Sequence, residues 1–144
     1  MDSGAPTRIM LSDDHPVVRR GLRNILESTN QFEVCAEAGD GQETIELATS
    51  LRPDILIADI SMPPPNGLEV AARLRESLPE TKVLILTMHD SAEMLRAAAA
   101  AGASGYLLKS DAEELLSVAL HCLRQGHPFV SPTFDPHLVK QLFG

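Results

Sequence analysis

Short apolar segments alternate with longer amphipathic ones along the chain, and this alternation restricts the fold more than any other feature. Two of the short segments, residues 55–58 and 83–86, are uninterrupted apolar runs, which are typical of strands covered on both faces. The longer segments repeat apolar residues at helical spacing. Strands that alternate with helices form a parallel sheet with right-handed crossovers and helices on both sides. The strands are predicted at residues 8–12, 32–36, 55–58, 83–86 and 105–108.

Helix starts are indicated by capping boxes, in which a polar side chain and an acidic residue three positions later satisfy free backbone amides. Such pairs occur at Asp40/Glu43, Asn66/Glu69, Asp90/Glu93 and Ser110/Glu113. Pro16 suits the first turn of the remaining helix, because its missing N–H is not needed there. Gly102 and Gly126 fall where helices should end. The pattern predicts five β-α units, and therefore an α/β fold with a doubly wound, five-stranded parallel sheet.

The chain has 144 residues, of which 44% are hydrophobic, and this is enough for one packed core. We expect a flexible N-terminal segment at residues 1–7 and one domain at residues 8–126. The regular pattern ends at Gly126, and Pro128, Pro132 and Pro136 interrupt the last part of the chain. Residues 127–144 are therefore predicted to be a linker or terminal appendage, with a short last helix within residues 134–143.

Charge and composition exclude several classes of function. The 12 basic and 20 acidic residues give a net charge of −8, and there is no basic run, so this segment is not expected to bind nucleic acid by itself. The N-terminus does not resemble a signal peptide, and the longest apolar run, residues 97–101, is too short to cross a membrane. Cys35 and Cys122 lack metal-ligand spacing and are expected to be reduced thiols, which predicts a cytoplasmic protein.

Polar side chains follow the predicted strands at the edge where parallel α/β sheets bind ligands. Asp13 and Asp14 follow the first strand, and Asp59 follows the third. Thr87 lies at the end of the fourth strand and Lys109 directly after the fifth. We therefore expect three carboxylates, a hydroxyl and an ammonium group at one edge of the sheet.

Three carboxylates at one edge must raise a pKa or bind a cation. Oxygen ligands without clustered His or Cys favour Mg²⁺ or Ca²⁺, and Mg²⁺ commonly serves phosphate chemistry. Lys109 and Thr87 offer a positive charge and a hydroxyl to phosphoryl oxygens. Each residue alone also has a structural interpretation as a helix cap, a turn residue or a surface lysine. Their joint placement favours phosphoryl transfer onto Asp59.

Four motifs give the sequence a resemblance to the receiver domain of two-component response regulators. The matching motifs are SDDHPVVR at residues 12–19, DISMPPPNG at 59–67, LTMH at 86–89 and GASGYLLK at 102–109. The likeness extends from about residue 8 to residue 126, and the first and last motifs resemble the NarL/FixJ group, whose full-length members usually carry a LuxR-type helix-turn-helix. It implies a flavodoxin-like receiver fold with strand order 2-1-3-4-5.

The resemblance also implies a role for each site residue. Asp59 would be the phosphoacceptor. Asp14 would ligate Mg²⁺ directly, Asp13 would act mostly through metal-bound water, and the backbone carbonyl of Ser61 would be the third protein ligand.

The remaining roles concern the phosphoryl group and the switch. Thr87 and Lys109 would hold phosphoryl oxygens, and Tyr106 would change rotamer when Thr87 is drawn inward. Pro64 departs from the family pattern, because a glycine is common at that position. Ser61 and His89 lie where the family tunes the rate of dephosphorylation.

The resemblance implies partners as well. A sensor histidine kinase would supply the phosphoryl group, and the domain would catalyse only its own phosphorylation and dephosphorylation. Phosphorylation would shift a partner or homodimer surface, with the first or fifth helix as the candidate dimer surfaces. DNA would be bound through a helix-turn-helix domain missing from this chain, and no membrane contact is implied.

Three other interpretations fit parts of the sequence. A phosphatase with an aspartyl nucleophile usually has a second acid two residues later, where this chain has Ser61. A flavin or nucleotide binder needs a phosphate-binding loop where Asp13 and Asp14 stand. The main alternative is a receiver-like interaction module that acts without phosphorylation.

Overall fold

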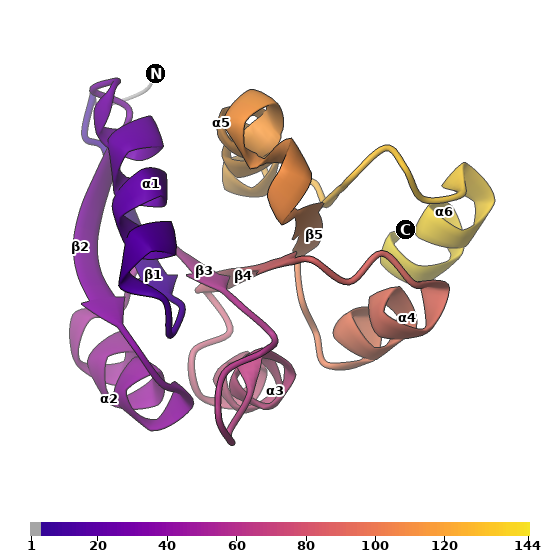
Figure 1. The fold of residues 1–144 in the computed structure, drawn as a ribbon, viewed down its shortest axis with the longest axis horizontal. Coiled ribbons are helices and arrows are strands. Elements are labelled where there is room, and N and C mark those ends of the chain that lie inside the picture. The colour runs from indigo at the N-terminus through magenta and orange to yellow at the C-terminus, as the bar shows by residue number, and fades with distance from the viewer. Residues whose placement is uncertain (1–3) are drawn as a thin grey trace.

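The computed structural model describes residues 4–144, and a six-stranded sheet runs through this part of the chain. The strand order is β2-β1-β3-β4-β5-β6, and every neighbouring pair is parallel (Figure 1). The order of the first five strands confirms the predicted doubly wound sheet. The strands are β1 (Thr7–Ser12), β2 (Phe32–Ala38), β3 (Ile55–Ala58), β4 (Lys82–Thr87), β5 (Gly105–Leu108) and β6 (Phe129–Val130).

Helices cover both faces of this sheet, with α1 and α5 on one side and α2, α3 and α4 on the other (Figure 1). A short 3-10 turn, η1, connects β5 to α5. The helices are α1 (Pro16–Glu27), α2 (Gly41–Leu51), α3 (Gly67–Ser77), α4 (Ala92–Ala100), α5 (Ala112–Arg124) and α6 (Pro136–Phe143), and η1 is Lys109–Asp111.

Alternate residues of the central strands enter two separate hydrophobic clusters. In β3, Ile55 and Ile57 pack with α1 and α5, whereas Leu56 and Ala58 pack with α2, α3 and α4. All four are buried. Because side chains alternate along a strand, a strand buried on both faces needs apolar residues at every position. This is why the central strands read as uninterrupted apolar runs.

Two of the predicted helix caps are found at the expected residues. Asn66 forms the complete box with Glu69, since each side chain accepts a hydrogen bond from the other residue's amide, at 2.9 and 2.8 Å. Asp40 accepts from the Glu43 amide at 2.8 Å, but the Glu43 carboxylate accepts from the amide of Gly39. Both side chains therefore stabilise the starts of their helices.

The other two predicted caps are wrong. Helix α4 is capped by Ser91 rather than Asp90, because the Ser91 hydroxyl accepts a hydrogen bond from the Met94 amide at 3.2 Å. Ser110 lies inside the turn η1, so its backbone does not take the extended conformation of a cap, and α5 begins after Asp111 without a side-chain cap.

Residues 127–144 add a strand that was not expected. Strand β6 pairs with β5, and the Ser131 hydroxyl beyond it accepts a hydrogen bond from the Leu108 amide at 2.8 Å. Phe134 is buried and meets the ring of Tyr106 edge-on, with ring centroids 5.4 Å apart. The expected last helix is α6, which contacts α4. A strand of two residues among prolines has no periodic signal, so the sequence pattern could not reveal it.

The N-terminal end differs slightly from expectation. Thr7, expected within the flexible segment, is buried as the first residue of β1, while residues 1–3 of that segment lie outside the described residues. Between Gly4 and Gly144, no helix has both the length and the apolar composition needed to cross a membrane. Cys35 and Cys122 are free thiols and are partly buried.

We predict that Phe134→Ala destabilises the whole domain, because it removes a buried ring that packs against Tyr106 in the core. The expected loss is about 3 kcal/mol in the free energy of unfolding. Met88→Ala is the control, since Met88 is 79% exposed and its loss should change stability by no more than about 0.5 kcal/mol. Urea unfolding measures both, and equal midpoints for the two variants would show that the C-terminal segment does not contribute to the core.

Candidate functional site

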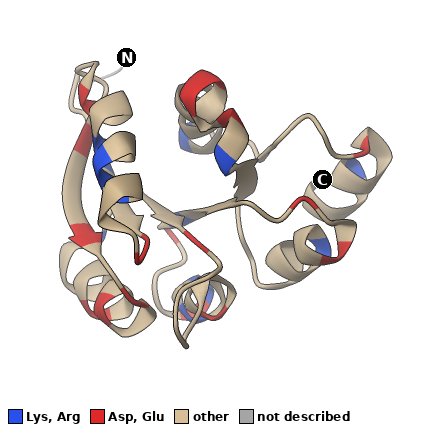
Figure 2. Cartoon of the chain, in the orientation of Figure 1, with Lys and Arg blue, Asp and Glu red and all other residues tan. Residues whose placement is uncertain are grey.

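A cluster of acidic residues, called the acidic pocket below, lies at the carboxyl ends of β1 and β3, where Figure 2 shows Asp and Glu in red. Pairing of these strands continues beyond their ends, because the Asp59 amide donates to the carbonyl of Ser12 at 3.0 Å. On the other side, the Asp13 amide donates to the carbonyl of Ala38 at 3.1 Å. Asp13 and Asp59 are only 2% and 3% exposed. The sheet itself therefore holds two buried carboxylates side by side.

Lys109 lies between these two carboxylates. Its Nζ atom is 3.1 Å from Oδ2 of Asp13 and 3.3 Å from Oδ2 of Asp59. Burial raises the pKa of Asp59, and the charge of Asp13 raises it further, against the lowering effect of the Ser61 amide and Lys109. Burial alone would lower the pKa of Lys109, but its bonds to Asp13 and Asp59 raise it above the ordinary value. The ammonium group therefore stays charged and offsets part of the acidic charge.

Asp14 and His15 form the exposed side of the same pocket. The Nδ1 atom of His15 is 2.9 Å from Oδ1 of Asp14 and 3.1 Å from Oδ1 of Asp13. The His15 amide also donates to Oδ1 of Asp13 at 2.9 Å. His15 precedes α1 without capping it through its side chain. The structure thus places the His15 ring on the acidic pair, a contact that the sequence motif did not indicate.

The donor set fits a hard divalent cation. Ligand atoms of Asp13, Asp14, His15 and Asp59 all lie within 4.8 Å of one another. Oδ2 of Asp13 is buried and has no hydrogen bond of good geometry, although Lys109 neutralises part of its charge. Converging carboxylate oxygens are the ligands that Mg²⁺ prefers. Ser61 is adjacent, with its amide donating to Oδ1 of Asp59 at 3.2 Å, and its carbonyl as a further ligand stays a prediction.

Thr87 and Tyr106 are connected through one residue of the loop after β4. The Thr87 hydroxyl accepts a hydrogen bond from the His89 amide at 3.1 Å, and the Tyr106 hydroxyl donates to the His89 carbonyl at 2.7 Å. Both side chains are fully buried. Burial, with a smaller contribution from the charge of Asp90, raises the pKa of Tyr106 to about 12, so its hydroxyl remains a donor. The sequence indicated both end residues but not that His89 connects them.

The loop after Asp59 approaches the site very closely. A Cβ atom at Gly67 would lie 2.2 Å from the backbone oxygen of Asp59, so only glycine fits at the start of α3. Pro65 is packed in the same way against Gly41 at the start of α2, where a Cβ would lie 1.9 Å from its carbonyl oxygen. The proline-rich loop is thus held against two helices, and Asp59 lies beneath it.

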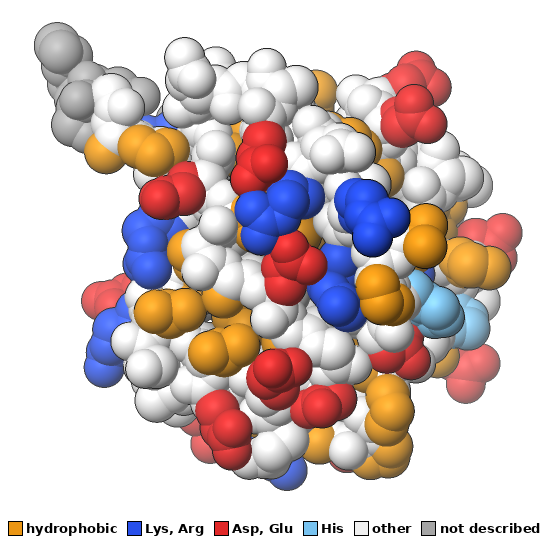
Figure 3. Space-filling view, turned by 60° about the vertical axis from the view of Figure 1, so that its left-hand side comes forward, with side chains coloured by type: hydrophobic (Ala, Val, Ile, Leu, Met, Phe, Trp, Pro, Cys, Tyr) orange, Lys and Arg blue, Asp and Glu red, His pale blue; other side chains and the backbone are white. Residues whose placement is uncertain are grey.

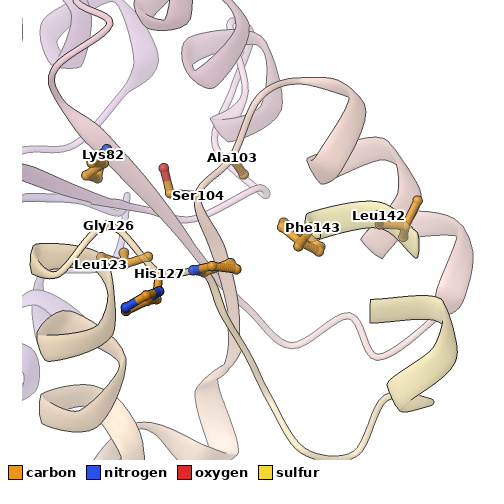
Figure 4. Close-up of a pocket in the computed structure, with 9 residues that line it drawn as sticks. Lys82, Ala103, Ser104, Leu123, Gly126, His127, Leu142 and Phe143 are labelled. Atoms are coloured by element: carbon orange, nitrogen blue, oxygen red, sulfur yellow. The ribbon is translucent and has the colours of Figure 1, made fainter. Parts of the chain in front are cut away.

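A separate cavity of about 260 Å³ lies at the opposite edge of the sheet (Figure 4). Its lining includes Lys82 at the start of β4, Ser104 before β5, and His127 and Phe143 of the C-terminal segment. None of the clustered carboxylates lines it. This hollow is therefore distinct from the acidic pocket.

Comparison with known proteins identifies the class. The response regulator receiver domain family matches residues 9–120, and the chain belongs to this family. The oxygen regulatory protein NreC of Staphylococcus epidermidis (strain ATCC 12228) is 42% identical over 135 residues, and NreC of Staphylococcus aureus (strain JH9) is 40% identical. Each alignment covers 93% of this chain and 62% of the relative, so the chain spans about three-fifths of the length of these relatives.

Solved structures agree with this assignment. A LuxR-family two-component response regulator from Aurantimonas sp. SI85-9A1 matches with a TM-score of 0.86 and 36% identity, over 96% of this chain and 95% of that one. The isolated receiver domain of RcsB from Salmonella enterica serovar Typhimurium, with the phosphomimetic BeF3⁻, matches with a TM-score of 0.81 and 28% identity over 96% and 99%. The predicted family and its LuxR-type group are therefore confirmed.

We predict that Gly67→Ala destabilises the domain by about 1–3 kcal/mol, because its Cβ would collide with backbone atoms of Asp59 and Ile60. Gly21→Ala is the matched control, since a Cβ there meets nothing within 4 Å, and alanine in a helix should stabilise by about 0.5–1 kcal/mol. Thermal unfolding of both variants tests this. A stable Gly67→Ala would contradict the close packing over Asp59.

We also predict that Asp59→Asn is more stable than the wild type at pH 7 in metal-free buffer. The pKa of Asp59 is raised by folding, so the folded protein holds its proton more tightly than the unfolded chain does. Wild-type stability therefore falls as pH rises from the ordinary aspartate pKa through the raised one. The advantage of the variant should vanish when unfolding is measured at acidic pH. An advantage that is unchanged down to pH 3 would refute this electrostatic cause.

Proposed function

We propose that this domain is a phosphorylation-activated switch that accepts a phosphoryl group on Asp59 from a sensor histidine kinase. One observation carries the proposal: a buried carboxylate, Asp59, lies within 3.3 Å of the Lys109 ammonium and beside a second buried carboxylate, Asp13. An aspartate that only caps a helix or forms a turn is usually exposed to solvent and has neither an ammonium group nor a second buried carboxylate beside it. Family membership supports the same conclusion.

In the proposed reaction, a carboxylate oxygen of Asp59 attacks phosphorus in line with the bond to the histidine nitrogen of the kinase. That P–N bond breaks as the acyl phosphate bond forms, and the histidine keeps the electron pair. Asp13, Asp14, Asp59 and the Ser61 carbonyl would hold Mg²⁺, which when bound offsets the negative charge that develops on the phosphoryl oxygens. Water later hydrolyses the acyl phosphate.

Lys109 and Thr87 would then bind phosphoryl oxygens. Lys109 already contacts Asp59, so a small shift of its flexible side chain brings the ammonium to the new group. Thr87 holds the His89 amide, and its turn toward the phosphoryl group would remove that hydrogen bond. The carbonyl of His89 accepts a hydrogen bond from the Tyr106 hydroxyl, so movement of His89 would change the rotamer of Tyr106. Couplings of this kind are about 1–3 kcal/mol and act by shifting populations.

For the longer protein, we propose transcription regulation through a C-terminal DNA-binding domain of the LuxR type. The similarity to NreC and to a LuxR-family regulator supports this proposal. Residues 8–126 would be the receiver, and residues 127–144 would lead toward the output domain. A cytoplasmic location and a homodimer through α1 or α5 belong to the same proposal. The domain itself would catalyse only its own phosphorylation and dephosphorylation.

The intact mass after incubation with acetyl phosphate tests the proposal. We expect the wild type to gain one phosphoryl group in the presence of Mg²⁺ but not in EDTA. Asp59→Ala should gain none, while the control Asp90→Ala, which removes an exposed carboxylate outside the cluster, should behave as the wild type. If no condition phosphorylates the wild type, the domain is instead a phosphorylation-independent interaction module.

A further inference from the structure

Arg19 connects three parts of the structure next to the acidic pocket. It lies in the first turns of α1, and its Nη1 atom donates a hydrogen bond to the backbone carbonyl of Asp13. Its Nε atom donates to Oε1 of Glu37, near the end of β2, at 3.0 Å. The side chain is only 20% exposed. The guanidinium group thus ties the loop after β1 to the neighbouring strand.

The contact with Asp13 controls the peptide that leads into Asp14. The amide of Asp13 is already held by the carbonyl of Ala38 at 3.1 Å, so with Arg19 both backbone groups of Asp13 are bound. The carbonyl of Asp13 and the amide of Asp14 lie in one planar peptide unit. Arg19 therefore sets the direction from which the Asp14 side chain leaves the backbone. Asp14 needs this support because its side chain is 32% exposed, compared with 3% for Asp13.

Glu37 holds Arg19 in place and cancels its charge. Burial alone would raise the pKa of Glu37, but hydrogen bonds from Arg23 and Arg19 lower it below the ordinary value, so Glu37 stays ionised. Basic and acidic side chains lie against one another on the face that α1 and β2 present (Figure 3). The neutral Arg19–Glu37 pair leaves little net repulsion toward a cation in the pocket, and its main effect is geometric.

Arg23 is a natural control for Arg19. It lies one turn later in α1 and binds the same partner, with its Nη2 atom 2.6 Å from Oε2 of Glu37. It also pairs with Glu27 at 2.7 Å, and its hydrogen bonds go to these two glutamates rather than to Asp13. Replacing either arginine by methionine removes one positive charge and one partner of Glu37. Only the Arg19 variant also removes the hydrogen bond to the carbonyl of Asp13 in the loop after β1.

We propose that Arg19 is a positioning residue that preorganises Asp13 and Asp14 for a divalent cation. This inference rests on the proposed function, because it assumes that the acidic pocket binds Mg²⁺. Arg19 does not touch the cation. It reduces the entropy cost of fixing the Asp14 side chain when the cation binds. Residues that orient metal ligands generally act in this way.

The test is a Mg²⁺ titration followed by NMR amide shifts on the wild type, Arg19→Met, Arg19→Lys and Arg23→Met. We expect Arg19→Met to weaken Mg²⁺ affinity by about 10-fold, the lower end for outer partners of metal ligands. Arg23→Met should change affinity by less than about 2-fold, and Arg19→Lys should fall between the two because an ammonium can still donate to one carbonyl. Hydrogen exchange of the amides of residues 13–15 without Mg²⁺ should accelerate in Arg19→Met alone.

The outcomes separate this inference from the proposal it rests on. Equal weakening by Arg19→Met and Arg23→Met would overturn the positioning role, because charge alone would explain both. Unchanged affinity in a folded Arg19→Met would overturn it too. If Arg19→Met fails to fold, the Arg19→Lys and Arg23→Met titrations decide in the same way. A wild type that does not bind Mg²⁺ would instead overturn the cation site itself.

Discussion

One ammonium group lies between two buried carboxylates at the carboxyl edge of the sheet, and the rest of the site depends on this contact. Parallel pairing of β1 with β3 brings Asp13 and Asp59 together, and backbone hydrogen bonds hold the main chain of both residues at the strand ends. Burying two like charges is costly unless they are paired or one takes a proton. Lys109 supplies part of the compensation, while burial and the charge of Asp13 still raise the pKa of Asp59. The fold therefore creates an electrostatic demand that a cation would satisfy.

The same edge of the sheet is connected by hydrogen bonds and packing to the C-terminal segment. From Thr87 the contacts run through His89 to the hydroxyl of Tyr106. The ring of Tyr106 meets Phe134, and its backbone carbonyl accepts a hydrogen bond from the amide of Ser131 at 2.9 Å. Residues 127–144 are thus packed onto the strand that ends at the site. A change in the position of Tyr106 would therefore alter the contacts of this segment with β5.

Much of this arrangement could be predicted from residue types alone. Uninterrupted apolar runs indicated the buried parallel strands, and the residues following them indicated which side chains would meet. The predictions were less successful where local geometry decides the outcome. The cap of α4 moved from Asp90 to Ser91, because two neighbouring polar residues could both serve and only backbone conformation selects one. Strand β6 and the contact of Phe134 with Tyr106 depend on tertiary packing that leaves no periodic trace in so short a segment.

The roles of His89 and Arg19 were not predictable for a related reason. Both roles depend on backbone groups: the amide and carbonyl of His89 bond the side chains of Thr87 and Tyr106, and Arg19 donates to the carbonyl of Asp13. A sequence shows which side chains carry chemistry, but it does not show which peptide groups they hold. The side chains of the acidic pocket were therefore indicated in advance, whereas the interactions that orient them became visible only in the structure.

Phosphorylation of Asp59 would produce an acyl phosphate, and the chemical lability of the phosphoryl group distinguishes this product from a phosphoester. Acyl phosphates react with hydroxylamine to leave a hydroxamate on the carboxylate, whereas phosphoesters of Ser, Thr and Tyr do not. The phosphorylated protein should lose its phosphoryl group in hydroxylamine, and peptide mass spectrometry should find the hydroxamate at Asp59 alone. A phosphoryl group that survives hydroxylamine, or a hydroxamate at another residue, would contradict the account.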